Sequence, residues 1–67
     1  MNKNYFEIKE KKQENKMYRV LLCDLLLFID HCIRYNYKYD EFKNVYLELE
    51  KKIEENEKII KDLESDL

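Results

Sequence analysis

The sequence predicts an all-α protein that associates with partner chains, and three observations support this prediction. The 67-residue chain contains no Gly and no Pro, so it lacks the residues that build the tight turns of most sheet proteins. A heptad pattern of apolar residues begins at residue 18 and continues to the end of the chain, as in packed helices. A domain of this size buries only about 60% of its unfolded surface and usually needs disulfides, a metal or partner chains.

Residues 1–16 are expected to form a charged N-terminal arm or an extension of the first helix. The first nineteen residues carry six basic and three acidic side chains. The lysines could contact phosphates, with Tyr5 and Phe6 as stacking groups, but interleaved glutamates dilute the positive field. A solvated helix face is therefore the simpler interpretation, and nucleic acid is not an expected partner.

Residues 17–35 are expected to form an apolar helix with two parallel seams. The first seam comprises Tyr18, Leu21, Leu25, Phe28 and Cys32, and the second comprises Leu22, Leu26, Ile29 and Ile33. A helix that is apolar nearly all round is buried nearly all round, and one partner helix cannot cover both seams. We therefore expect two copies of a two-helix antiparallel hairpin to dimerise into a four-helix bundle with this helix at its centre.

Residues 36–39 are the expected turn of the hairpin. Tyr, Asn and Asp, which are poor helix formers, cluster at this point of the chain. Asn36 tolerates a left-handed helix cap when Gly is absent. Arg34 suits the end of one helix and Asp40 the start of the next. Antiparallel folding would also lay the basic N-terminal arm beside the acidic second helix.

Residues 40–67 are expected to form an amphipathic helix with five basic and ten acidic side chains. Its seam comprises Phe42, Tyr46, Leu49, Ile53, Asn56, Ile60 and Leu63. A polar residue such as Asn56 at a seam position commonly fixes register or oligomeric state at a cost in stability. Together with both seams of the first helix, these residues form the predicted core of the oligomer.

One long helix is the alternative to the hairpin. The heptad phase passes through the expected turn without a break, and fifty helical residues would extend about 75 Å. Such a helix would form a parallel coiled coil, in which Lys52 of one chain could meet Glu57 of another. In the hairpin, by contrast, Leu21 is expected near Ile53.

Polar and aromatic residues outside the seams are the candidates for contacting another protein. Asp24 interrupts the apolar run and needs a partner, such as Arg19, wherever it is buried. Tyrosines are favoured at interfaces, and an acidic helix can compete for a basic groove on a target. The candidate contact residues are Asp24, Tyr35, Tyr37, Tyr39, Glu50, Glu57 and Glu64.

The sequence offers no catalytic or metal site and implies no cofactor. Cys23, His31 and Cys32 are the nearest approach to a metal cluster, but they lack the spacing of zinc motifs, which converge three or four ligands. His31 and Cys32 are adjacent and therefore point in different directions on a helix, so they do not form a nucleophile and its base. We expect no enzymatic activity.

Unpaired cysteines in an apolar stretch indicate a reducing, cytoplasmic location. The longest apolar run, residues 20–29, contains a carboxylate and is far shorter than the roughly 20 residues that span a membrane. No leader peptide is expected either. The abundance of Asn, Lys, Tyr and Ile is typical of AT-rich genomes and of their phages and mobile elements.

The sequence thus predicts a non-enzymatic protein–protein interaction module that forms homodimers or larger oligomers. Its expected role is that of a small inhibitor or modulator of another protein, encoded by a phage or mobile element. Two other functions remain open, a structural scaffold that brings chains together and a nucleic-acid-associated regulator that uses the N-terminal lysines.

Overall fold

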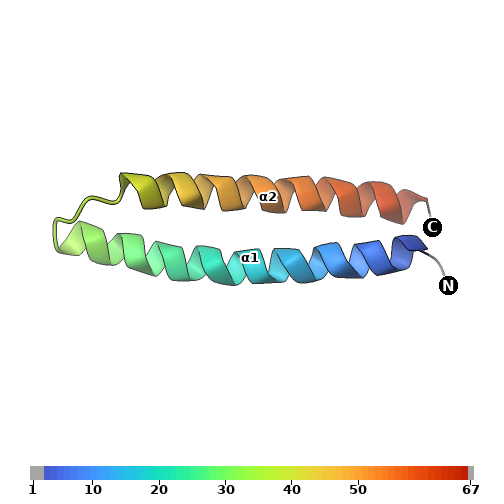
Figure 1. Cartoon of the computed structure of the whole chain (residues 1–67), viewed down its shortest axis with the longest axis horizontal. Helices are drawn as coiled ribbons and strands as arrows, with labels where there is room; N and C mark the ends of the chain where they lie inside the picture. The colour runs from blue at the N-terminus through green and yellow to red at the C-terminus, as the bar shows by residue number, and fades with distance from the viewer. Residues whose placement is uncertain (1–2, 67) are drawn as a thin grey trace.

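Two helices lie side by side and antiparallel along their whole length in the computed structural model, which describes residues 3–66 (Figure 1). Helix α1 spans Lys3–Arg34 and helix α2 spans Asp40–Ser65. The hairpin measures 52 × 14 × 12 Å, with both chain ends at one end and the turn at the other (Figure 1). The predicted all-α hairpin is confirmed, and the alternative of one long helix is wrong. Residues 1 and 2 of the expected N-terminal arm and residue 67 of the expected second helix lie outside the described residues.

The turn is built around Asn36, which adopts the left-handed conformation with φ of 59°. The Tyr37 N–H donates to the Cys32 carbonyl at 2.8 Å, and the Asn36 N–H donates to the Ile33 carbonyl at 3.4 Å. These two bonds form a Schellman motif, which satisfies carbonyl groups that the end of α1 would otherwise leave unpaired. Asparagine takes the place of glycine here because its short polar side chain tolerates this conformation.

Charges near the turn suit the two helix dipoles. The last turn of α1 contains His31 and Arg34, while the first turn of α2 contains Asp40 and Glu41. Cations at a helix C-terminus and anions at a helix N-terminus are each stabilising. The Lys43 N–H donates to the carbonyl of residue 39 at 3.0 Å and so begins α2. The turn therefore breaks the chain where helix propensity is lowest, although the heptad phase continues.

The seam between the helices follows positions three and four residues apart. On α1 the buried and half-buried seam residues are Asn4, Ile8, Lys11, Asn15, Tyr18, Leu22, Leu25, Ile29 and Cys32. On α2 they are Tyr46, Leu49, Ile53, Asn56, Ile60 and Leu63, and Tyr39 is half-buried just before α2 begins. Residues 3–16 thus form the first part of α1 and contribute four positions to the seam.

The seam on α1 differs in phase from the one expected. Leu22 and Ile29, from the expected second seam, join the hairpin interface, whereas Leu21 and Phe28 lie at its edge and are each 46% exposed. Because apolar residues lie on two adjacent stripes of α1, the apolar pattern alone does not determine which stripe faces α2. The phase is settled by the first half of α1, because only the observed phase places Ile8 and Asn15 against α2.

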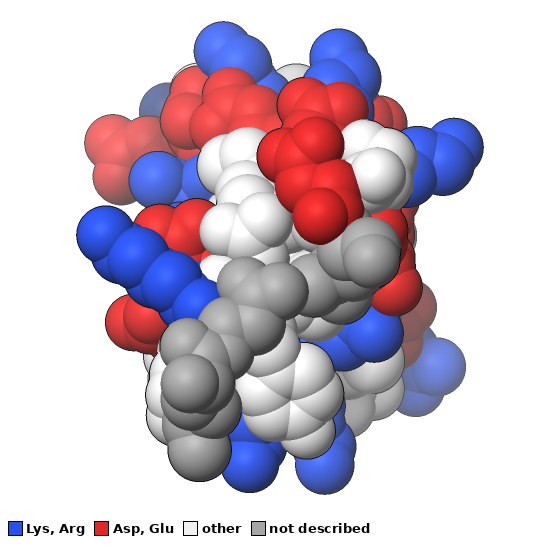
Figure 2. Space-filling model, turned by 90° about the vertical axis from the view of Figure 1, so that its right-hand side faces the viewer, with Lys and Arg blue, Asp and Glu red and all other residues white. Residues whose placement is uncertain are grey.

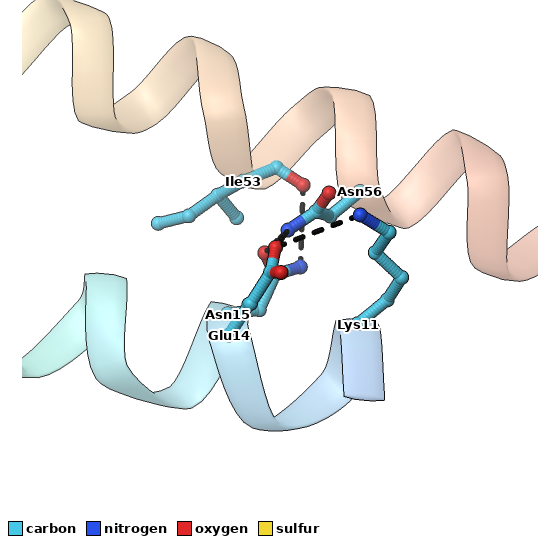
Figure 3. Close-up of polar contacts among 5 residues, drawn as sticks. All are labelled: Lys11, Glu14, Asn15, Ile53 and Asn56. Atoms are coloured by element: carbon cyan, nitrogen blue, oxygen red, sulfur yellow. Dashed lines mark hydrogen bonds and ion pairs between the residues drawn. The ribbon is translucent and has the colours of Figure 1, made fainter. Parts of the chain in front are cut away.

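A pair of asparagines joins the helices inside this seam (Figure 3). Asn56 donates from Nδ2 to Asn15 Oδ1 at 2.9 Å, and Asn15 donates from Nδ2 to the Ile53 carbonyl at 3.3 Å. Asn56 Nδ2 also donates to Glu14 Oε1 at 3.0 Å, and Lys11 approaches the same oxygen at 3.7 Å. Asn15 is 2% exposed and Asn56 7%. A shift of one heptad would separate these buried amides, so the pair fixes the register.

Removing one member of this pair should cost more stability than replacing both. We expect Asn15→Ala to lower the free energy of unfolding by about 1–3 kcal/mol, because the buried Asn56 amide loses a partner. The double change Asn15→Leu/Asn56→Leu should recover that loss, since no amide then stays unpaired. Urea unfolding followed by circular dichroism measures both, with Gln13→Ala on the exposed side of α1 as the control. A single variant as stable as the parent chain would contradict a register role for the pair.

Candidate interaction surface

One edge of the seam is closed by ion pairs between the helices. Lys12 Nζ lies 3.8 Å from Glu64 Oε2, and Arg19 donates from a guanidinium nitrogen to Glu57 Oε1 at 2.9 Å. Because these side chains are exposed, each pair contributes at most about 1 kcal/mol. Their main effect is to favour the antiparallel orientation, in which the basic half of α1 meets the acidic helix.

The charge difference between the helices is visible at the end of the molecule where the chain termini lie. Figure 2 shows acidic side chains crowded over the half that contains α2, with Lys and Arg side chains around the rim. Charge on this end is therefore mixed, with acid concentrated on one helix.

The second half of α1 exposes large apolar side chains on the side turned away from α2. Met17 is 57% exposed, Val20 58% and Leu27 71%. Their spacing of three and seven residues places them on one stripe, opposite the seam. Leu21 and Phe28 border the same stripe. We call this surface the outer strip, and it comprises Met17, Val20, Leu21, Leu27 and Phe28.

Apolar side chains are exposed on other sides of this segment as well. Leu26 and Ile33 continue, at seven-residue steps, the edge that carries Lys12 and Arg19, and both are about half exposed. Several such residues together on a monomer mark an interaction site. Between residues 17 and 33, then, α1 is covered on the seam side and bare elsewhere.

The outer strip is joined to α2 by an aromatic contact. The rings of Phe28 and Phe42 meet edge to face, with centroids 4.7 Å apart and planes at 66°. Val45, three residues after Phe42 on α2, is also exposed. Edge-to-face packing adds to the stability of an apolar contact, so the Phe42 ring favours this orientation of Phe28.

The turn end of the hairpin carries a row of aromatic rings. The His31 and Tyr35 rings lie 4.6 Å apart, and the Tyr35 and Tyr37 rings are stacked with centroids 6.5 Å apart. Tyr35 and Tyr37 are exposed, whereas Tyr39 is half-buried on the seam. Two of the three predicted tip tyrosines are therefore available to another protein.

Asp24 lies exposed in the middle of the outer strip. Its expected partner Arg19 is engaged with Glu57 instead. Among residues 3–66 no ion pair or hydrogen bond is made by the Asp24 side chain. Within the described residues, a carboxylate without an ion pair or hydrogen bond thus interrupts an exposed apolar surface.

The three glutamates predicted to contact another protein are engaged within the hairpin. Glu57 and Glu64 form the ion pairs with α1. Glu50 accepts a hydrogen bond from the Tyr46 hydroxyl, and this bond, together with desolvation and the negative charge of Glu50, raises the pKa of Tyr46 above 10.0. The contacts of these three glutamates are therefore made within the hairpin.

No metal centre is formed by the described part of the chain. Cys23 is exposed and Cys32 is buried on the seam, so the two thiols face different surroundings. Within residues 3–66 no three His, Cys, Asp or Glu side chains converge to hold an ion. Neither helix, over the same residues, is long and apolar enough to cross a membrane.

The sequence prediction missed Asn15 and Ile8. A signal for both exists, because steps of three and four residues backward from Leu22 pass through Tyr18, Asn15, Lys11 and Ile8. Polar residues at two of these positions hide the pattern. Extending the seam backward through its polar positions would have identified Asn15 and Ile8 as seam residues.

Replacing Glu50 with Gln should lower the pKa of Tyr46 toward 10.0. The amide keeps a hydrogen-bond acceptor but removes the negative charge that opposes phenolate formation. A pH titration of the Tyr46 ring by carbon-detected NMR measures the change, and Glu54→Gln serves as the control. In the parent chain, the stability that neutral Tyr46 contributes should be present below pH 10 and lost as pH rises through its raised value. A Tyr46 pKa unaffected by Glu50→Gln would contradict this coupling.

No protein-family model matches the chain, and no curated protein or solved structure is detectably similar to it.

Proposed function

We propose that this hairpin is a non-enzymatic protein-interaction module that self-associates through α1 and acts as a small inhibitor or modulator of another protein. The outer strip is the observation that carries the proposal. Its five apolar residues are each 46–71% exposed, and each side chain fully removed from water contributes about 1.5–3 kcal/mol. A surface of this kind is stabilised by contact with another apolar surface.

The shape of the hairpin supports a role in binding proteins and not in turnover of small molecules. Its cross-section of 14 × 12 Å is that of two packed helices, whereas substrate sites are clefts that bury most of the surface of their ligand. What the molecule offers instead is an outer strip on α1 and the stacked Tyr35 and Tyr37 at the turn. A small, charged, two-helix chain of AT-rich composition suits a phage-encoded modulator.

The two surfaces suggest two partners. The outer strip is mainly apolar, as a permanent interface between like chains is. The tip is smaller, and its tyrosines combine apolar area with a hydrogen-bonding group, as the anchors of protein interfaces do. We assign the outer strip to self-association and the tip to the target protein.

A scaffold that only brings chains together is the second candidate function. The same outer strip favours it, because self-association alone would satisfy the apolar surface. A scaffold does not need the exposed tyrosines at the turn. The two candidates therefore differ in whether a change at the tip has any effect.

Self-association should depend on the outer strip. We expect the parent chain to be a dimer in light scattering coupled to size-exclusion chromatography. Leu27→Glu should yield a folded monomer, because it places a charge at the most exposed position of the strip. Leu47→Glu, at an exposed position of α2, is the matched control and should stay dimeric. A parent chain that is monomeric at all concentrations would contradict self-association.

Target binding should depend on the tip. We expect Tyr37→Ala to abolish co-purification of a specific target from cells that express the chain, with helix content and dimerisation unchanged, because Tyr37 is exposed. Leu47→Ala is the control, since it removes an exposed side chain on α2 outside the turn. If Tyr37→Ala leaves every associated protein in place, the scaffold is the better description.

A further inference from the structure

The outer strip carries two polar groups seven residues apart. Asp24 lies in its middle, and His31 continues the same stripe toward the turn, since both stand at three- and four-residue steps from Leu27. Asp24 has no ion pair among the described residues. Arg34, the other basic side chain at this end of α1, is engaged with Asp30 at 3.1 Å. The His31 ring lies against the rings of Tyr35 and Tyr37 and makes no ion pair with a carboxylate among residues 3–66.

The spacing of these two groups favours one orientation for a second copy of the hairpin. In a parallel arrangement, Asp24 of one copy would face Asp24 of the other, and like charges in contact are unfavourable. A two-fold axis that passes between Leu27 and Phe28 reverses the second copy. It places Asp24 of each copy opposite His31 of the other, with apolar residues between the two polar contacts.

We propose that a second copy docks antiparallel on the outer strip, with Asp24 of each copy bound to His31 of the partner copy. The proposal rests on the self-association proposed above and specifies its surface and direction. An imidazole N–H donates to a carboxylate whether the ring is neutral or charged, and a dry apolar surround strengthens such a bond. The carboxylate that interrupts the apolar run thereby selects one register of the dimer.

The position of the axis also explains the exposure of Leu27. At 71% it is more exposed than the other residues of the outer strip. In the antiparallel dimer it lies beside the axis, opposite Phe28 of the partner copy, where burial is greatest. The aromatic contact with Phe42 holds Phe28 ready for this position.

Disulfide cross-linking tests the direction of docking. Leu27→Cys and Val20→Cys are made separately on a Cys23→Ser background, with the buried Cys32 unchanged. Leu27→Cys should form a covalent dimer on mild oxidation, because its two copies meet at the axis. Val20→Cys should not, because its two copies lie about 22 Å apart along the helix. Cross-linking of both variants would indicate parallel docking. Cross-linking of Val20→Cys alone would indicate another register. Either result would overturn the proposal.

A charge swap tests the polar contact. Asp24→Lys alone and His31→Asp alone should each weaken the dimer at least about tenfold by sedimentation equilibrium, and the double variant Asp24→Lys/His31→Asp should restore it. Glu48→Lys makes the same change of charge as Asp24→Lys at an exposed position of α2, and it should leave the affinity of the dimer unchanged. Circular dichroism verifies that each variant is folded.

Different results would overturn self-association and the antiparallel contact. A parent chain that never dimerises overturns the proposed self-association itself. A stable dimer that Leu27→Glu disrupts, but that tolerates Asp24→Lys and His31→Asp, leaves self-association intact and overturns only the antiparallel contact proposed for Asp24 and His31.

Discussion

The hydrogen-bonded pair of Asn15 and Asn56 is the constraint on which the rest of the hairpin depends. Two buried amides satisfy each other and the Ile53 carbonyl, and they can do so in one register only. That register aligns Lys12 with Glu64 and Arg19 with Glu57. It also selects which stripe of α1 faces α2. Apolar packing alone would accept several phases of a helix that is apolar on most sides.

The choice of phase determines which surface is left for other molecules. With Leu22 and Ile29 in the seam, the outer strip and its carboxylate face outward. Had Leu21 and Phe28 been in the seam, Asp24 would have moved toward the edge of the hairpin, and a different set of leucines would be exposed. The interaction surface on the outside is thus a consequence of polar bonds made on the inside, in the other half of α1.

Much of the fold could be predicted from the sequence, because its signals are local. The absence of Gly and Pro, the weak helix formers near Asn36 and the opposite charges of the two arms were enough for the hairpin and its turn. The phase of α1 could not be predicted, since Leu21 and Leu22 suit the seam equally well until Asn15 is paired with Asn56 across 41 residues. Of the candidate site, Asp24 and the exposed Tyr35 and Tyr37 remain as surface groups, while Glu50, Glu57 and Glu64 are engaged within the hairpin. Those contacts depend on register, which no single helix determines.

The distance of the asparagine pair from the turn has a consequence for how the chain folds. Closing the short loop at residues 36–39 costs little entropy, whereas a first contact between Asn15 and Asn56 would close a far longer loop. We therefore expect the helices to join at the turn and to zip toward the termini. The pair that fixes the register then forms late, after most of the apolar seam is in place. In this order, a hairpin that has zipped out of register is left with unpaired buried amides and reopens. The asparagine pair then selects the correctly aligned hairpin at the last stage of folding.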